Sequence, residues 1–345
     1  MQIIDLVPDL RPTIMAAREL RDARNSLSRF LPYVNVPAIT YRLGRRKRMD
    51  QTAPVRAFGA PATPIRRPGV MDIRGELPAI TPIVNFNEVD LNQELVLAQQ
   101  LAGLQVNWQP FVTAGAALAA ATVDNTFELM RGQALSNFEV ALIAEDGEVH
   151  TVNYDVPAEQ KITADAPWSI DNPAQVFADY SAAHEAYLDI AGAPAGIALT
   201  TSKVRTMLTN ALQGLYPQQP VGNDQLNAYL ANKNLPTPVT YDRMLETLPG
   251  QRERVYPEGH LTFLPSGDDP VGRTEMGVTQ EAVQQSQRQQ PNGQPALNAQ
   301  ANEVPGLTIV TLGNEDPVER AVKGAAVGLP ILQDKDIVVL AGLIA

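Results

Sequence analysis

The segment between residues 54 and 82 restricts the fold of this chain more than any other part of the sequence. It contains six prolines, interspersed with Gly59, Gly69 and Gly75. Proline lacks a backbone donor and clashes with the preceding helical turn, so this segment cannot be the interior of a helix. Together with its flanking residues, this segment belongs to a stretch of about 45 residues with only weak strand character. Such a stretch is too long for an ordinary connection inside a compact domain. The sequence therefore predicts an extended arm or lobe with a function of its own.

Basic residues gather beside this segment. Residues 45–48 read Arg-Arg-Lys-Arg, and residues 1–74 carry 14 Arg and Lys against 6 Asp and Glu, a local charge of +8. The rest of the chain carries 13 basic and 32 acidic side chains, a charge of −19, and the two parts sum to −11. A chain with a pI near 4.8 is a poor candidate for a dedicated nucleic-acid binder, which needs a basic surface.

Three interpretations of the basic cluster at 45–48 stay open. It is a solvated surface, a nucleic-acid contact, or a contact with the acidic surface of a neighbouring copy. The last is favoured because the remainder of the chain is acidic. Self-assembly is therefore the leading expectation.

The N-terminal region predicts one helix followed by strand character. Residues 12–31 have the spacing of an amphipathic helix that ends at Pro32, and residues 33–43 favour a strand. The face of the helix is expected to consist of Ile14, Leu20, Leu27 and Leu31.

The middle of the chain predicts two helices and a hairpin. Asn87 can cap a helix over 88–103, in which Leu91, Leu95, Ala98 and Leu101 follow helical spacing. An alanine-rich segment from Phe111 to Leu135 predicts a helix of roughly 35 Å whose small residues allow close packing across a sheet. Its expected face includes Leu118, Val123, Phe127 and Met130. Asp146-Gly147 between two β-rich runs, 138–143 and 148–154, is typical of a hairpin turn.

The second half has a mixed pattern of helices and strands. Helices are predicted from Pro173, with Val176, Phe177, Tyr180, Tyr187 and Leu188 on one face, over 201–212 with Gly214 as the stop, and after Asn223. Strands are predicted at 196–200, 239–241, 260–264, 307–312 and 337–344. Residues 284–300 are rich in Gln and have few apolar anchors, which indicates a surface excursion.

Catalytic and metal-binding patterns are missing from the sequence. There is no cysteine, no dinucleotide or phosphate-loop fingerprint, no Gly-x-Ser-x-Gly, and the three histidines, His150, His184 and His260, are scattered. The acidic clusters at 268–269, 315–316 and 334–336 are expected in solvated turns. We therefore expect no catalytic residue, no cofactor and no metal site.

No membrane association is expected either. No run approaches the roughly 18 apolar residues that span a bilayer, and the first residues lack the pattern of a secretory signal. A cytoplasmic origin fits both observations.

Several stretches, taken in order, resemble the lambda-type major capsid proteins of tailed bacteriophages, the capsid protein E family. The first are Leu27-Ser-Arg-Phe-Leu-Pro32 with Val36-Pro-Ala-Ile-Thr40, and Pro54-Val-Arg-Ala-Phe-Gly-Ala-Pro61 with Gly75-Glu-Leu-Pro-Ala-Ile80. Later ones are Phe263-Leu-Pro265 and Gly272-Arg-Thr-Glu-Met-Gly-Val-Thr-Gln280. The clearest stand near the end: Leu312-Gly-Asn-Glu-Asp-Pro-Val-Glu-Arg320, Ala325-Ala-Val-Gly-Leu-Pro-Ile-Leu332 and Asp334-Lys-Asp-Ile-Val-Val339. The 284–300 segment has no counterpart in that pattern.

The resemblance implies an α+β chain with the Hong Kong 97-like phage capsid fold. Its parts would be an N-terminal arm at 1–40, an extended loop at 41–84, a peripheral domain with a long spine helix at 85–156, completed by 305–345, and an axial domain at 157–304. The implied function is a non-enzymatic major capsid protein that forms hexamers and pentamers of an icosahedral head around double-stranded DNA. The alternative is another virion or tail subunit without icosahedral closure.

The resemblance also implies the partners. These are further copies of the chain, a separate scaffolding protein, a portal at one vertex, packaged DNA in non-specific proximity, and a decoration protein as a further candidate. The product would be located in the virion after assembly in the host cytoplasm. The candidate contacts between subunits are Arg42, Arg45, Arg46, Lys47, Arg48, Arg56, Arg66, Arg67 and Arg74.

Overall fold

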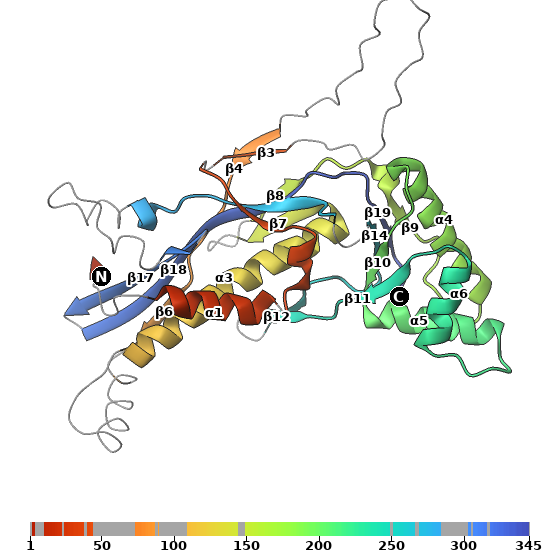
Figure 1. The fold of residues 1–345 in the computed structure, drawn as a ribbon, viewed down its shortest axis with the longest axis horizontal. Coiled ribbons are helices and arrows are strands. Elements are labelled where there is room, and N and C mark those ends of the chain that lie inside the picture. Colours follow the sequence, from red (N-terminus) through yellow and green to blue (C-terminus); the bar gives the residue numbers. More distant parts are fainter. Residues whose placement is uncertain are drawn as a thin grey trace, which may run out of the picture.

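The computed structural model describes residues 2–3, 10–22, 24–37, 40–43, 73–86, 89, 109–143, 149–248, 251–265, 269–283, 303–304, 306–315 and 318–344. The described residues form an elongated molecule with two hydrophobic cores (Figure 1). One core lies between a long helix and a sheet that includes the longest strands. The other lies between three shorter helices and a second sheet.

The long helix, α3 (Gln109–Asn137), is the central element of the first core. It confirms the helix predicted at 111–135 and extends it by two residues at each end, to 29 residues or about 43 Å. Val123, Phe127 and Met130 are buried as expected, whereas Leu118 is 56% exposed. Alanines at 116, 119 and 120 have no exposed surface and let the sheet approach the helix closely.

The first sheet is built around two long antiparallel strands, β17 (Leu307–Glu315) and β18 (Val318–Leu332). β18 also pairs antiparallel with β15 (Gly272–Met276). β15 in turn pairs in parallel with β2 (Tyr33–Asn35). Four short strands complete this sheet: β1 (Gln2–Ile3) and β16 (Glu303–Val304) on β17, and β5 (Ala79–Ile80) and β6 (Ile83–Phe86) on β18. Residues from both ends of the chain therefore meet in one sheet.

The N-terminal helix is shorter than the sequence pattern predicted. Helix α1 (Arg11–Asp22) ends ten residues before Pro32, and a 3-10 turn, η1 (Ser26–Arg29), follows it. Ile14, Leu27 and Leu31 are buried, but Leu20 is 74% exposed. The chain bends because Asn25 is buried and its side chain donates to the backbone oxygen of Asp124 on α3. A contact 99 residues away is invisible to local periodicity.

The second core is covered by α4 (Pro173–Ala191), α5 (Ser202–Leu215) and α6 (Asn223–Asn232), the three helices predicted in this part of the chain. Gly192 ends α4 in the left-handed conformation, with φ of 74°. Two expectations here were wrong. Leu188 is 41% exposed, and Gly214 lies inside α5, which continues to Leu215.

The sheet beneath these helices has the order β11-β10-β14-β19-β9. Its strands are β9 (Lys161–Thr163), which follows the 3-10 turn η2 (Ala158–Gln160), β10 (Ile197–Thr200), β11 (Thr237–Thr240), β14 (Leu261–Leu264) and β19 (Val338–Ala341). The last strand anchors the C-terminal region in this sheet, as the apolar run at 337–344 predicted.

Three further antiparallel strand pairs stand outside the two sheets. β7 (Glu139–Ile143) and β8 (Val149–Asn153) confirm the predicted hairpin. β12 (Met244–Leu248) with β13 (Gln251–Arg254) was not predicted. β3 (Thr40–Leu43) pairs with β4 (Ile73–Glu76), so the strand predicted over 33–43 is divided into β2 and β3.

Some predictions lie outside the described residues. They include the turn at Asp146-Gly147, the Gln-rich segment 284–300, and all of the helix over 88–103 except Val89, which is helical.

Candidate assembly site around the long helix

Of the nine basic residues expected at subunit contacts, the structure describes only two, and both lie at the base of the extended loop. Arg42 and Arg74 stand opposite each other in the β3–β4 pair. Arg45, Arg46, Lys47, Arg48, Arg56, Arg66 and Arg67 lie outside the described residues. Tyr41 is buried at this base, and a side chain at Gly75 would collide with the Tyr41 ring. The described geometry thus places the start and the end of the predicted loop side by side.

A network of buried charged and polar side chains lies on one face of α3. Glu128 and Arg131 have fully buried side chains and form an ion pair of 3.2 Å between Glu128 Oε2 and Arg131 Nη1. Asp124 lies one turn earlier on the same face and is also buried. Buried charges are costly unless they are paired and hydrogen-bonded, so the partners of these three residues decide what the network does.

Glu128 fixes the N-terminal segment to α3. Its Oε1 atom accepts a hydrogen bond from the backbone N–H of Leu27 at 3.0 Å. Asp124 accepts from the hydroxyl of Tyr33 at 3.1 Å and forms an ion pair of 3.4 Å with Arg18 of α1. The helix, the 3-10 turn and the start of β2 are therefore all held by carboxylates of one helix.

Arg131 connects the same network to the first sheet. Its Nε atom donates to Thr274 Oγ1 at 3.0 Å, and Thr274 Oγ1 donates to the backbone oxygen of Leu31 at 2.8 Å. The Arg131 guanidinium also lies 4.2 Å from the centroid of the Tyr33 ring, a cation–π contact. Thr274 is thus a junction between α3, β15 and the N-terminal segment.

A third connection leads toward the second core. The hydroxyl of Tyr241, which follows β11, donates to Glu128 Oε1 at 2.7 Å. Arg243 donates to Asn125 Oδ1, also at 2.7 Å. Glu128 therefore receives donors from the N-terminal segment, from α3 itself and from the segment that enters the β12–β13 hairpin.

Burial and nearby charge keep the phenols of this network neutral. Burial raises the pKa of Tyr33 far above its usual value, and burial together with the adjacent Glu128 carboxylate does the same for Tyr241. Both hydroxyls consequently stay protonated at neutral pH and can donate hydrogen bonds there. The arrangement is suited to holding elements in place rather than to proton transfer.

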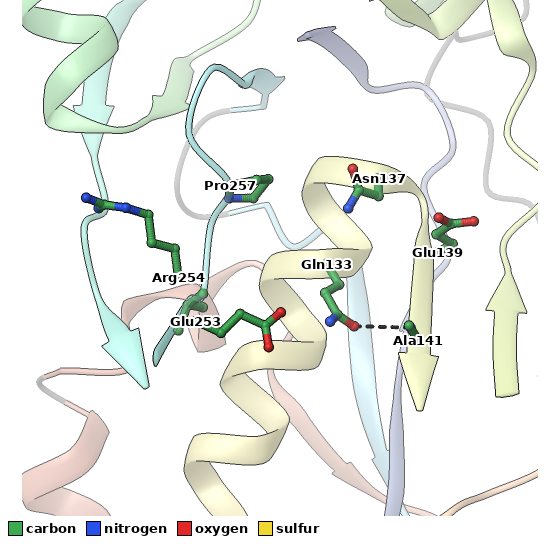
Figure 2. A pocket seen from close by; sticks show the side chains of 8 residues that line it. Gln133, Asn137, Glu139, Ala141, Glu253, Arg254 and Pro257 are labelled. Carbon is green, nitrogen blue, oxygen red and sulfur yellow. Dashed lines mark hydrogen bonds between the residues drawn. The ribbon is translucent and has the colours of Figure 1, made fainter. Parts of the chain in front are cut away.

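A small hollow of about 120 Å³ lies where α3, β7 and β13 meet (Figure 2). Gln133 Oε1 accepts a hydrogen bond from the Ala141 N–H at 3.1 Å across its edge. The Arg254 side chain extends away from the hollow, and it forms an ion pair of 2.7 Å with Glu258. The described lining has two carboxylates, Glu139 and Glu253, and no histidine or hydroxyl nucleophile, so it offers no catalytic constellation.

The acidic cluster at 334–336 is not a solvated turn, and that expectation was wrong. Asp334, Lys335 and Asp336 are buried where the chain passes from β18 to β19 and so from one core to the other. The Asp334 carboxylate accepts from the Asp336 N–H at 2.9 Å, and Lys335 Nζ donates to the Asp155 backbone oxygen at 3.3 Å. Gln160 donates to the backbone oxygens of Lys335 and Ile337. The cluster therefore ties the two sheets together.

Within the described ranges, no group of three or more His, Asp or Glu side chains is arranged to hold a metal ion. His184 is buried and accepts from the Ala195 N–H, and burial lowers its pKa. Among the same residues, no helix is long and apolar enough to cross a membrane.

The buried network was not predicted from the sequence. A signal was present: Asp124, Glu128 and Arg131 are spaced by four and three residues along the same side of the helix as Phe127 and Leu135, which are apolar and buried. Charged residues within an apolar face require partners elsewhere in the chain. Their partners stand up to 143 residues away, and local patterns do not reveal them.

This fold is shared with proteins of phage origin. A crystal structure of a protein described as the capsid protein of a prophage in E. coli CFT073 has a TM-score of 0.51 at 12% identity, over 79% of this chain and 80% of that one. A phage-related protein from Bordetella bronchiseptica RB50 has a TM-score of 0.56 at 12% identity, over 99% of this chain and 98% of that one. No curated protein sequence matches the chain.

The chain has the Hong Kong 97-like fold that was expected from the sequence. Its marks are the long helix against a sheet, the paired base of an extended loop and a second, helix-covered sheet. The family model described as phage major capsid protein E matches residues 32–292, and the chain belongs to that family. The protein is a structural subunit of the phage shell and is located in the virion. The shell is built from many copies of this one chain.

Proposed function

We propose that this chain forms hexamers and pentamers that close into an icosahedral head around double-stranded DNA. The match to the major capsid family over residues 32–292 is the observation that carries the proposal. One chain can occupy both kinds of capsomer if its contacts tolerate small changes of angle while its body stays rigid. The buried network on α3 supports the second requirement because it joins three parts of the subunit.

The proposed division of labour follows the chain. Residues 1–40 are the N-terminal arm, 41–84 the extended loop over a neighbour, 85–156 with 305–345 the peripheral domain, and 157–304 the axial domain around the capsomer axis. The subunit has no catalytic activity in this proposal. A scaffolding protein, a portal and a decoration protein are its proposed partners, DNA lies in non-specific proximity, and assembly takes place in the host cytoplasm.

Electron microscopy of the protein co-expressed with the scaffolding protein of its phage tests the proposal. We expect closed icosahedral particles, because the chain belongs to the major capsid protein family. Tubes, rings or stacked discs without icosahedral closure would instead favour another virion or tail subunit. Only monomers in every fraction would contradict both.

The basic cluster is proposed to contact acidic groups on a neighbouring subunit. Replacing Arg45, Arg46, Lys47 and Arg48 by Glu should leave a folded subunit, since surface changes rarely unfold a domain, but closed particles should be lost. Circular dichroism and thermal unfolding of the subunit check its folding, and particle yield from sedimentation checks assembly. A normal yield of particles would remove this role from the cluster.

A further inference from the structure

The loop between α5 and α6 is exposed, yet a single side chain holds its shape. Figure 1 shows this loop beyond the second core, at the end of the molecule away from β17 and β18. The Nε2 atom of Gln213 donates to the backbone oxygens of Tyr216 and Gln219 at 3.1 and 2.8 Å. The Oε1 atom of the same amide accepts from the Val221 N–H at 2.9 Å. A loop that is already fixed in this way loses little conformational entropy when it binds.

Large apolar side chains are exposed at the start of this loop. Leu215, the last residue of α5, is 37% exposed, and Tyr216 is 49% exposed. Ile170, which precedes α4, is 57% exposed and adjoins them, because a Cβ atom at Gly214 would lie 3.7 Å from its backbone oxygen. We call Ile170, Leu215 and Tyr216 the tip surface. Exposed apolar side chains that gather in one place are typical of a protein contact.

The charge of this region favours a second copy of the chain as the partner. Asp224 is the only charged residue between positions 206 and 232, although 19% of the whole chain is charged. With a net charge of −11, copies of the chain repel one another, so they approach at the lowest electrostatic cost where the surface is neutral. Aromatic and aliphatic residues with few charges are also the usual composition of the centre of an interface between identical subunits.

The size of the tip surface indicates a contact within a ring rather than a free dimer. A stable interface between two separate proteins buries about 800 Å² on each partner, which is more than three side chains provide. In a ring of subunits, other contacts hold the copies together and raise the effective concentration of each small surface. The tip surface can therefore contribute in an assembly without joining free subunits prematurely.

We propose that Ile170, Leu215 and Tyr216 of one copy pack against the same end of the neighbouring copy within a capsomer. This inference rests on the proposed axial position of residues 157–304 and adds to it the residues and the chemistry of a contact. The contact is apolar and neutral, in contrast to the charged contact proposed for residues 45–48.

Photochemical cross-linking tests this contact. Tyr216 is replaced by the photoreactive residue p-benzoylphenylalanine, which reacts with whichever residue of a neighbour it meets. Isotope-labelled and unlabelled subunits are mixed before the scaffolding protein is added, so that mass spectra separate links between copies from links within one chain. The same replacement at Met244, which is also 49% exposed but lies on β12, is the control.

We expect links from position 216 to residues 165–232 of another copy, about tenfold more abundant than links from position 244 to the same region, because docking raises the effective concentration. Three results would overturn the proposal if they hold in every oligomer separated by sedimentation: links only within one chain, links only to another protein or another part of the neighbour, or yields equal to those of the control. Particle images taken in parallel separate the two questions, because closed shells without these links leave the proposed function intact.

Added charge provides a second test. Leu215→Asp with Tyr216→Asp places like charges on the tip surface of every copy, so the yield of particles should fall about tenfold. Thermal unfolding of the free subunit should stay close to that of the parent, because both side chains are exposed. Leu215→Met with Tyr216→Phe keeps the surface apolar and should assemble normally.

Val149→Asp with Met244→Asp is the matched control for this test, because it adds the same charge at two apolar residues that are 59% and 49% exposed. We expect a smaller loss of particles from the control than from the tip variant. An equal loss in both, or a normal yield from the tip variant, would overturn the proposal.

Discussion

The two cores of this subunit differ in whether their ion pairs are buried or exposed. The core beneath α3 contains a fully buried ion pair, Glu128–Arg131, that holds the N-terminal segment and the entrance to the β12–β13 hairpin. The core beneath α4 and α5 is aromatic and aliphatic, and its ion pairs lie at the surface, as in Lys203–Glu258, where the side chains are 54% and 35% exposed. The difference indicates that the first core fixes the position of other parts of the subunit, whereas the second mainly packs.

The largest expected effect comes from breaking the buried pair. Glu128→Leu leaves the Arg131 guanidinium without its carboxylate and deprives the Leu27 N–H and the Tyr241 hydroxyl of their acceptor, so the free energy of unfolding should fall by about 3–5 kcal/mol. Urea unfolding of the free subunit measures it. The exposed counterpart, Lys203→Met, should cost about 0–1 kcal/mol.

A double variant sharpens this prediction. Glu128→Leu with Arg131→Met removes both charges and should cost less than the sum of the two single changes, because neither charge is left unpaired. Strict additivity would mean that the pair is not coupled, and similar losses for Glu128→Leu and Lys203→Met would erase the contrast between the cores.

Two helical glycines provide a smaller but cleaner comparison. A Cβ atom at Gly132 of α3 would collide with the backbone oxygen of Val255, whereas at Gly214 of α5 the nearest atom is Pro173 Cγ at 3.3 Å. Gly132→Ala should therefore cost about 1–3 kcal/mol through overpacking. Gly214→Ala should gain up to about 1 kcal/mol, since alanine is the better helix former. Thermal unfolding gives both signs, and a gain at both positions would show that α3 is not tightly packed there.

The smallest effect concerns pH and the second core. Burial lowers the pKa of His184 below its ordinary value of 6.5, so between the two pKa values the unfolded chain binds more protons. The stability that neutral His184 contributes is fully present above about pH 6.5 and is lost as the pH falls from there through the lower pKa of the folded state. The free energy of unfolding of His184→Gln should fall less than that of the parent between about pH 7 and pH 5. Identical losses in the parent and the variant would exclude this histidine as a source of acid sensitivity.

Local patterns in the sequence were sufficient for elements whose signals are local. The alanine-rich run predicted α3 to within two residues at each end, and the Pro173 start and the Asp-Gly turn predicted α4 and the β7–β8 hairpin. β18 was not predicted, although it is the longest described strand. It is buried on both faces and contains Gly324, Gly328 and Pro330, so it lacks the alternation by which a half-exposed strand is recognised.

The candidate site was less predictable because its geometry depends on contacts distant in sequence. Local periodicity predicted that the N-terminal helix continues to residue 31, but it ends at Asp22. After it, Asn25 donates to the backbone oxygen of Asp124 and the Leu27 N–H donates to the Glu128 carboxylate. Likewise, the turn-like residues around Asp334 and Asp336 predicted a solvent-exposed turn. These side chains are buried because the chain here crosses from one sheet to the other. The order of short motifs along the chain was the better guide to family and function.

Timed tryptic digestion of free subunits and purified shells, with the cleavage sites identified by mass spectrometry, tests most directly that this chain acts through assembly and that residues 41–84 form a contact between subunits. In free subunits we expect early cleavage after Arg42, Arg45, Arg46, Lys47, Arg48, Arg56 and Arg74, whereas Arg67, which precedes Pro68, should resist. In shells the same sites should be protected, while cleavage after the exposed Lys203 serves as the internal reference. Equal cleavage rates at these sites in both states would contradict the assignment of 41–84 as an assembly element.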